Sequence, residues 1–140
     1  MAPLDNLPTG SLRILQITDT HLYADPEGAL LGLKTLPSFS DVLKQAMEEA
    51  GTVDLILATG DLVHDASPEG YRVAGEIFSS LALPVYCIPG NHDIPDIMRQ
   101  HVVHDNVSTP FAVRHGSWLL VMMDSSILDG DGGHFTKEEL

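Results

Sequence analysis

Three short apolar runs, each with polar residues soon after its end, stand out in the pattern along the chain. They cover residues 13–18, 55–59 and 85–88 and consist mainly of Ile, Leu, Val and Thr. Runs of four to eight residues with this composition are typical of strands that are covered on both faces. We therefore expect three buried strands.

Apolar residues at helical spacing separate these runs. Before the second run the recurring residues are Val42, Leu43, Ala46 and Met47. They predict a helix that begins near Ser38 or Ser40 and ends at Gly51. Residues 67–69 (Ser-Pro-Glu) combine an N-cap serine, a first-turn proline and a first-turn acid, and predict a second helix. Its apolar face is expected to contain Val73, Ile77 and Leu81.

The chain beyond the third run predicts smaller elements. Residues 95–101 form a short helix at most, and residues 111–115 and 118–124 flank a His-Gly-Ser turn that predicts an antiparallel hairpin. We assign four apolar residues of this part and the single cysteine to the core: Phe111, Trp118, Met122, Met123 and Cys87. The alternation of strand and helix predicts an α/β fold with right-handed crossovers, in which a parallel βαβαβ core is followed by a hairpin.

Length and charge limit the class of protein. The 140 residues suffice for one domain, which we expect over residues 12–140 after a polar lead-in at 1–11. Seven basic residues face twenty acidic ones, a net charge of −13 that argues against nucleic acid and anionic membranes as partners. The chain has no signal-peptide pattern, no apolar run of membrane length and one cysteine, so we expect a cytoplasmic protein, with oligomers possible.

Metal-ligating residue types follow each of the three predicted strands. The first tip carries Asp19 and His21, the second Asp61 and then His64, and the third residues 91–93 (Asn-His-Asp). One such residue alone is usually a turn former or a helix cap. The carboxyl ends of parallel strands meet at one edge of a sheet, so these tips could form one site. The chain has no dinucleotide-binding, P-loop or serine-hydrolase motif.

The residue types in this set suit Mn, Fe or Zn ions. Two such ions about 3.5–4 Å apart can activate a water and stabilise the charge of a phosphoester under attack. Asp61, on the middle tip, would bridge them. His92 could protonate the leaving oxygen, with Asp93 either orienting His92 or capping a helix before Ile94. His64 could contact the substrate or support a ligand.

The segments LRILQITDTHL, GDLVHD and PGNHD resemble the first three blocks of the calcineurin-like metallophosphoesterases, most closely the bacterial cyclic-AMP phosphodiesterases. The resemblance implies the N-terminal half of a four-layer α/β/β/α sandwich. It also implies two divalent or trivalent metal ions held by Asp19, His21, Asp61 and Asn91, with His92 in catalysis. The implied reaction is hydrolysis of a small phosphodiester, 3′,5′-cyclic AMP, by a metal-bridged hydroxide. A phosphomonoesterase, a nuclease, or an inactive metal-binding or interaction fragment are the alternatives.

The resemblance is incomplete at the C-terminal side. The family carries further metal-binding histidines downstream, and no block of this chain matches them. Residues 136–139 (Thr-Lys-Glu-Glu) form a capping-box pattern that predicts the start of another helix. We therefore expect these 140 residues alone to bind metal weakly, to expose apolar surface and to hydrolyse substrate poorly.

Overall fold

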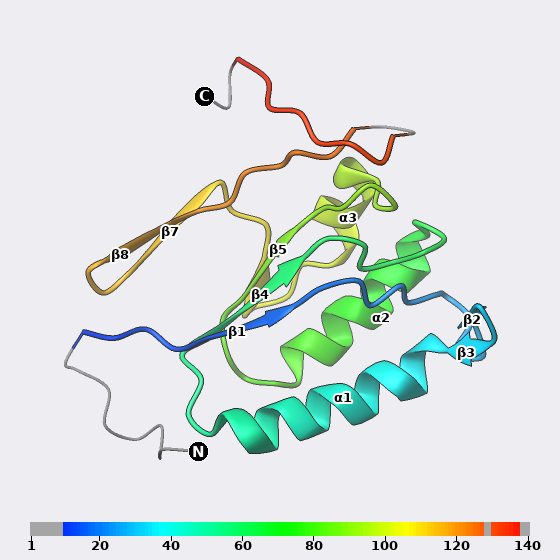
Figure 1. Cartoon of the computed structure of the whole chain (residues 1–140), viewed down its shortest axis with the longest axis horizontal. Coiled ribbons are helices and arrows are strands. Elements are labelled where there is room, and N and C mark those ends of the chain that lie inside the picture. Colours follow the sequence, from blue (N-terminus) through cyan, green and yellow to red (C-terminus); the bar gives the residue numbers. More distant parts are fainter. Residues whose placement is uncertain (1–9, 128–129, 138–140) are drawn as a thin grey trace.

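A computed structural model describes residues 10–127 and 130–137 of the chain. A parallel sheet with strand order β1-β4-β5-β6 forms its centre (Figure 1). Its strands are β1 (Ile14–Ile17), β4 (Leu55–Thr59), β5 (Val85–Ile88) and β6 (Val107–Ser108). The helices are α1 (Thr35–Ala50), α2 (Pro68–Ser79) and α3 (Pro95–His101). Two hairpins complete the fold: β2 (Ala29–Leu30) with β3 (Leu33–Lys34), and β7 (Ala112–His115) with β8 (Trp118–Val121).

The three predicted strands and the α/β class are confirmed. Ile17 pairs with Ala58 and Ala58 with Cys87, so β1, β4 and β5 run in parallel and end at the same edge of the sheet. The fourth strand, β6, was not predicted, because two residues are too few to give a hydrophobic period.

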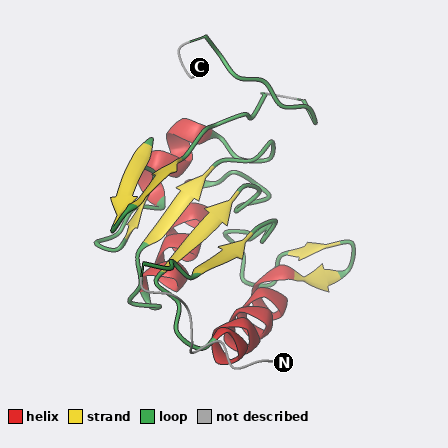
Figure 2. Cartoon of the chain, turned by 60° about the vertical axis from the view of Figure 1, so that its left-hand side comes forward, coloured by secondary structure: helices red, strands yellow, loops and turns green. Residues whose placement is uncertain are grey.

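The helices pack on one face of this sheet (Figure 2). One cluster of buried side chains joins Ile56, Val85 and Cys87 of the strands to Phe39 of α1 and Phe78 of α2. The prediction that the strands are covered on both faces is confirmed only in part within the described residues, where Leu55 is buried on the face away from the helices. Because side chains alternate across a strand, Gln16, Leu57 and Tyr86 lie on that face too, where they are exposed or half-buried.

Helix α1 begins about one turn before the predicted start, at Thr35, and Lys34 takes the N-cap position without a side-chain hydrogen bond. Its predicted end is confirmed by Gly51, which adopts a left-handed φ of 67°. The predicted apolar face is correct for Leu43, which is buried, and wrong for Val42, whose exposure is 62%. The buried residues of α1 are Thr35, Phe39 and Leu43, and Thr35 lies in the first turn, which the sequence pattern did not predict.

Helix α2 begins as predicted, with the Ser67 side chain accepting a hydrogen bond from the Gly70 backbone N–H (3.0 Å) and Pro68 in the first turn. Its buried face is rotated from the predicted one: Tyr71, Ala74, Gly75 and Phe78 are buried, and Val73, Ile77 and Leu81 are half-buried. Gly75 lies in the middle of this buried face. A Cβ at this position would lie 2.5 Å from the backbone oxygen of Val102, so only glycine allows this close approach of the chain after α3.

The predicted hairpin at β7 and β8 is confirmed, but its large aromatic residues are not core residues. Phe111 and Trp118 are 62% and 51% exposed, whereas Met122 is 8% exposed and Met123 half-buried. The hairpin forms a sheet of its own and leaves one side to solvent. The Trp118 ring N–H donates to the Gly10 backbone oxygen at 3.1 Å. Cys87 is buried as expected, and burial raises the pKa of its thiol to about 12.

Two predictions lie partly outside the described residues. Residues 1–9 of the predicted lead-in are not described, and neither are Glu138 and Glu139 of the predicted capping box. The division into a lead-in and a domain over residues 12–140 therefore stays a prediction. No helix of the described part is long and apolar enough to cross a membrane.

Candidate metal centre

The loop after β1 is tied to the loop after β4 by backbone hydrogen bonds. The N–H groups of Asp19 and His21 donate to the carbonyl oxygens of Gly60 (3.1 Å) and Asp61 (2.9 Å). Asp19, His21 and Asp61 all have positive φ angles, of 55°, 42° and 51°. Such angles are uncommon for residues other than glycine, and they concentrate at functional sites. Three of the predicted ligands thus share a backbone conformation that only Leu31, Ala66 and Ala82 also adopt among the other described non-glycine residues.

Asp61 lies where the tips of β4 and β5 meet. The His92 backbone N–H donates to its carboxylate at 3.0 Å. Gly90 makes this contact possible, because a Cβ there would lie 2.2 Å from the Asp61 carboxylate oxygen. Gly60 has a φ of 90°, and a Cβ on it would lie 3.0 Å from the Gly90 Cα. The Gly-Asp and Gly-Asn steps of the sequence therefore serve the close packing of two loops.

Asp19, His21 and Asp61 form one cluster of candidate ligands. Their donor atoms lie within 4.8 Å of one another. The His21 ring nitrogen Nε2 is 3.8 Å from an Asp61 oxygen and 4.0 Å from an Asp19 oxygen. The side chains of His21 and Asp61 are nearly buried (14% and 13% exposed), whereas Asp19 is 61% exposed. Two carboxylates and an imidazole that converge in this way match the ligand preference of Zn, Mn and Fe.

Three histidine rings gather next to this cluster. The ring of His64 stacks on that of His92, with centroids 4.9 Å apart, and its Nδ1 lies 3.2 Å from Nδ1 of His21. The His21 and His92 centroids are 5.1 Å apart. Desolvation, with the nearby His21 and His92, lowers the pKa of His64. His21, His64 and His92 could also hold a metal together, since their ring nitrogens lie within 4.8 Å of one another.

Asn91 and His92 lie on the exposed turn after β5. Asn91 directly precedes the His92 N–H that binds Asp61, which puts its backbone beside the carboxylate cluster. Its role as a ligand of a second metal stays a prediction, and so does the role of His92 in catalysis.

Asp93 has a role that differs from both sequence-based alternatives. It is 5% exposed and accepts hydrogen bonds from the backbone N–H groups of Leu62, Val63 and Gly90 and from the Tyr71 hydroxyl, at 2.9 to 3.2 Å. It does not cap α3, whose N-cap is Ile94, and none of these bonds reaches the His92 ring. Burial raises the pKa of this carboxyl although the four hydrogen bonds oppose the rise. Asp93 therefore holds the tips of β4 and β5 together beneath the site.

The sequence analysis missed Tyr71, which supports this arrangement from α2. The side chain is fully buried, its hydroxyl donates to Asp93 (2.9 Å), and it accepts from the Ile94 backbone N–H (3.0 Å). Burial and the Asp93 charge raise the pKa of the hydroxyl, so it stays a donor. Nothing in the sequence distinguishes Tyr71 from an ordinary core aromatic residue.

Replacing Tyr71 with phenylalanine is expected to lower the free energy of unfolding by roughly 1–3 kcal/mol, because a buried carboxylate oxygen and a backbone N–H each lose a partner. Urea denaturation measures the effect. The matched control is Tyr86→Phe, since the half-buried Tyr86 hydroxyl makes no hydrogen bond among the described residues. Equal stability of the two variants would show that the two hydrogen bonds of the Tyr71 hydroxyl do not stabilise the fold.

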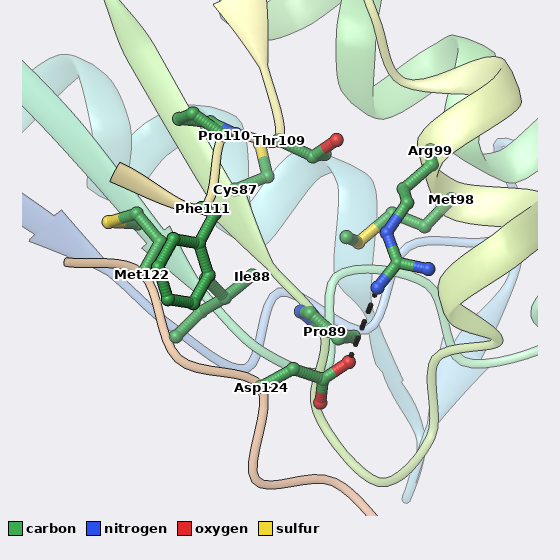
Figure 3. A pocket seen from close by; sticks show the side chains of 10 residues that line it. All are labelled: Cys87, Ile88, Pro89, Met98, Arg99, Thr109, Pro110, Phe111, Met122 and Asp124. Atoms are coloured by element: carbon green, nitrogen blue, oxygen red, sulfur yellow. Dashed lines mark ion pairs between the residues drawn. The ribbon is translucent and has the colours of Figure 1, made fainter. Parts of the chain in front are cut away.

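A cavity of about 150 Å³ lies beside the C-terminal end of β5, between α3 and the segments that flank the β7–β8 hairpin (Figure 3). Its charged groups satisfy one another: Arg99 of α3 pairs with Asp124 at 3.6 Å and with Asp96 at 3.1 Å. Asp124 also accepts hydrogen bonds from the backbone and hydroxyl of Ser126. The two charged residues among its described lining, Arg99 and Asp124, therefore pair with each other, whereas the carboxylates of the cluster at the strand tips have only a histidine as an ion-pair partner among the described residues.

Comparison with known proteins agrees with this geometry. The family model described as calcineurin-like phosphoesterase matches residues 12–137. The chain belongs to the calcineurin-like phosphoesterase family. The matched range contains all three strand tips and every candidate ligand. The resemblance inferred from the three sequence blocks is therefore confirmed.

Relatives within the family are named as cyclic-nucleotide phosphodiesterases. The 3′,5′-cyclic adenosine monophosphate phosphodiesterase of Vibrio vulnificus is 36% identical over 97% of this chain and 50% of its own length. The protein of that name from Haemophilus influenzae is 37% identical over 92% of this chain and 47% of its own length. A 3′,5′-cyclic-nucleotide phosphodiesterase of Nostoc sp. is 35% identical over 92% of this chain and 48% of its own length. The chain thus spans about half the length of the curated relatives it matches.

Proposed function

We infer that the protein to which this chain belongs is a metal-dependent hydrolase of small phosphodiesters, with 3′,5′-cyclic AMP as the substrate. The observation that carries this conclusion is the convergence of Asp19, His21 and Asp61 within 4.8 Å at the tips of parallel strands. Family membership and the names of the relatives support the substrate class.

The charge of the chain also favours metal over basic side chains as the binder of phosphate. The net charge is −13, and Lys34, Arg72 and Arg99 pair with carboxylates away from the cluster. Metal ions, when bound, would neutralise the phosphodiester and lower the pKa of a water that attacks it. We assign Asp19, His21, Asp61 and Asn91 to holding two such ions, of Fe, Mn or Zn.

The remaining residues of the site have roles in proton transfer and positioning. The exposed His92 ring lies 5.1 Å from the His21 ring, at the open side of the cluster, where it can donate a proton to the departing oxygen. His64 lies between His21 and Tyr23 and keeps the His21 ring in place through the 3.2 Å contact. Asp93 fixes the loops that carry Asp61 and His92.

Removal of metal is expected to abolish hydrolysis, because the described cluster supplies no other positive charge to the phosphate. The natural gene product is treated with excess chelator, and turnover of cyclic AMP is followed before and after Mn²⁺, Fe²⁺ or Zn²⁺ is restored. A phosphomonoester assayed in parallel separates the diesterase from a monoesterase. Undiminished turnover in chelator would rule out the metal-dependent mechanism, and a preference for the monoester would rule out the substrate class.

A further inference from the structure

A second cavity adjoins the metal cluster on the side of α1. Its volume is about 420 Å³, within the range of roughly 300–1,000 Å³ that is usual for small-molecule sites. Asp19 and His21 form one wall, and the β2–β3 hairpin with the first turns of α1 forms the other. Two candidate metal ligands therefore line this cavity as well as the cluster, so one ligand could occupy both.

The wall away from the cluster is mainly apolar. Leu33 and Val42 are 59% and 62% exposed and line the cavity beside Leu30 and Phe39. The Phe39 ring is buried and packs edge-to-face on Phe78, with centroids 6.1 Å apart, which fixes the floor. No lysine or arginine is among the described lining residues. This wall suits an uncharged flat group better than a second phosphate.

The turn of the hairpin is strained at an apolar residue. Leu31 and Gly32 have φ angles of 50° and 85°, a two-residue turn that strongly favours Asn-Gly. Leucine is sterically strained in this conformation, and the Leu31 side chain is fully exposed. Strained positions of this kind cluster at ligand clamps. Leu31 lines the same cavity. Contact with a bound ligand would bury this side chain and would account for a strained, exposed leucine at this position.

The hairpin is also fixed relative to the histidine cluster. A Cβ on Gly28 would lie 2.5 Å from the Tyr23 ring, so the hairpin backbone rests directly on that ring. The Tyr23 hydroxyl donates to the Ala29 oxygen at 3.3 Å, and its ring lies 5.1 Å from that of His64. Tyr23 thus links the hairpin to the histidines beside the metal cluster and holds the two at a fixed distance. Two parts of one substrate site require such a fixed distance.

We propose that this cavity binds the nucleobase of a cyclic nucleotide whose phosphate lies at the Asp19-His21-Asp61 cluster. A cyclic nucleotide has one anionic end and one flat, uncharged heteroaromatic end, which matches the two ends of the site. Thr35 and Ser38 line the cavity too and bring hydroxyl groups for the ring nitrogens of the base. The proposal rests on the proposed function for the position of the phosphate, but the apolar wall can be tested without hydrolysis.

The test uses adenosine, which carries the base and no phosphate, and the natural gene product labelled for NMR titration. Val42→Asp is expected to weaken adenosine binding about tenfold or more, the scale on which a pocket contact discriminates ligands. The matched control is Val103→Asp, which adds the same charge at a 49% exposed valine outside the cavity and should bind adenosine as the parent does. Shifts in the parent are expected at the hairpin and the start of α1.

Three outcomes would overturn the proposal. The first is no adenosine binding, and the second is equal binding by the Val42→Asp and parent proteins. The third is self-association of the protein through the exposed Leu31 and Leu33, if the Val42→Asp substitution abolishes it. A kinetic comparison separates this failure from failure of the proposed function. Cyclic AMP should be preferred over methyl riboside 3′,5′-cyclic phosphate, which lacks the base. Equal hydrolysis of both would refute the base pocket and leave the phosphodiesterase intact, whereas adenosine binding without any hydrolysis would refute the phosphodiesterase alone.

Discussion

Replacing Asp61 with alanine is expected to abolish phosphodiester hydrolysis and to weaken metal binding. Asp61 is the nearly buried carboxylate between the tips of β4 and β5, 3.8 Å from His21. Its loss removes ligand charge from the centre of the cluster, and metal ions at such sites supply several kcal/mol of transition-state stabilisation. At about 1.4 kcal/mol for each factor of ten in rate, the loss amounts to several orders of magnitude.

Metal content by mass spectrometry and cyclic AMP turnover, both on the natural gene product, measure this effect. Asp105→Ala is the matched control, because it removes an exposed acid outside the site and changes the net charge equally. Unfolding must be followed as well, since the Asp61 carboxylate accepts the His92 N–H. A folded Asp61→Ala protein with ordinary turnover would defeat the assignment of Asp61 as the bridging ligand.

Replacing His92 with alanine is expected to lower kcat by roughly 10²–10⁴, the usual contribution of a general acid. Metal content should hardly change, because the cluster of Asp19, His21 and Asp61 does not include His92. The backbone N–H of residue 92 still donates to Asp61 in this variant, so the loop should keep its position. Turnover and metal stoichiometry measured on one sample test both statements.

Loss of metal from the His92→Ala protein is the opposite result, and the positions of the three histidines make it a real alternative. His21, His64 and His92 also form a group with metal-ligand spacing. If metal is lost in parallel with turnover, His92 is a ligand and its assignment as an acid is wrong. His115→Ala, at the end of β7, controls for the removal of an imidazole elsewhere.

The sequence by itself was sufficient for the parallel core and for the place where the candidate ligands gather. Apolar runs at 55–59 and 85–88 matched β4 and β5 residue for residue, because the middle strands of a parallel sheet are rich in Val, Ile and Leu. Once the strands are parallel and adjacent, their carboxyl ends must meet. Asp19, His21 and Asp61 therefore came together as expected, from chain order and topology alone.

The tertiary structure decided which face each side chain occupies and what the polar residues contact. Asp93 could orient His92 or cap a helix as far as local sequence tells, yet it accepts four hydrogen bonds, three from residues 22 to 31 positions earlier in the chain. Val42 fits an apolar helix face by spacing, yet it lines an open cavity, whereas Phe39 and Leu43 of the same helix are buried in the core. Local pattern specifies a period and a residue type. Contacts between distant segments set rotation, burial and partner, and they exist only after the chain has packed.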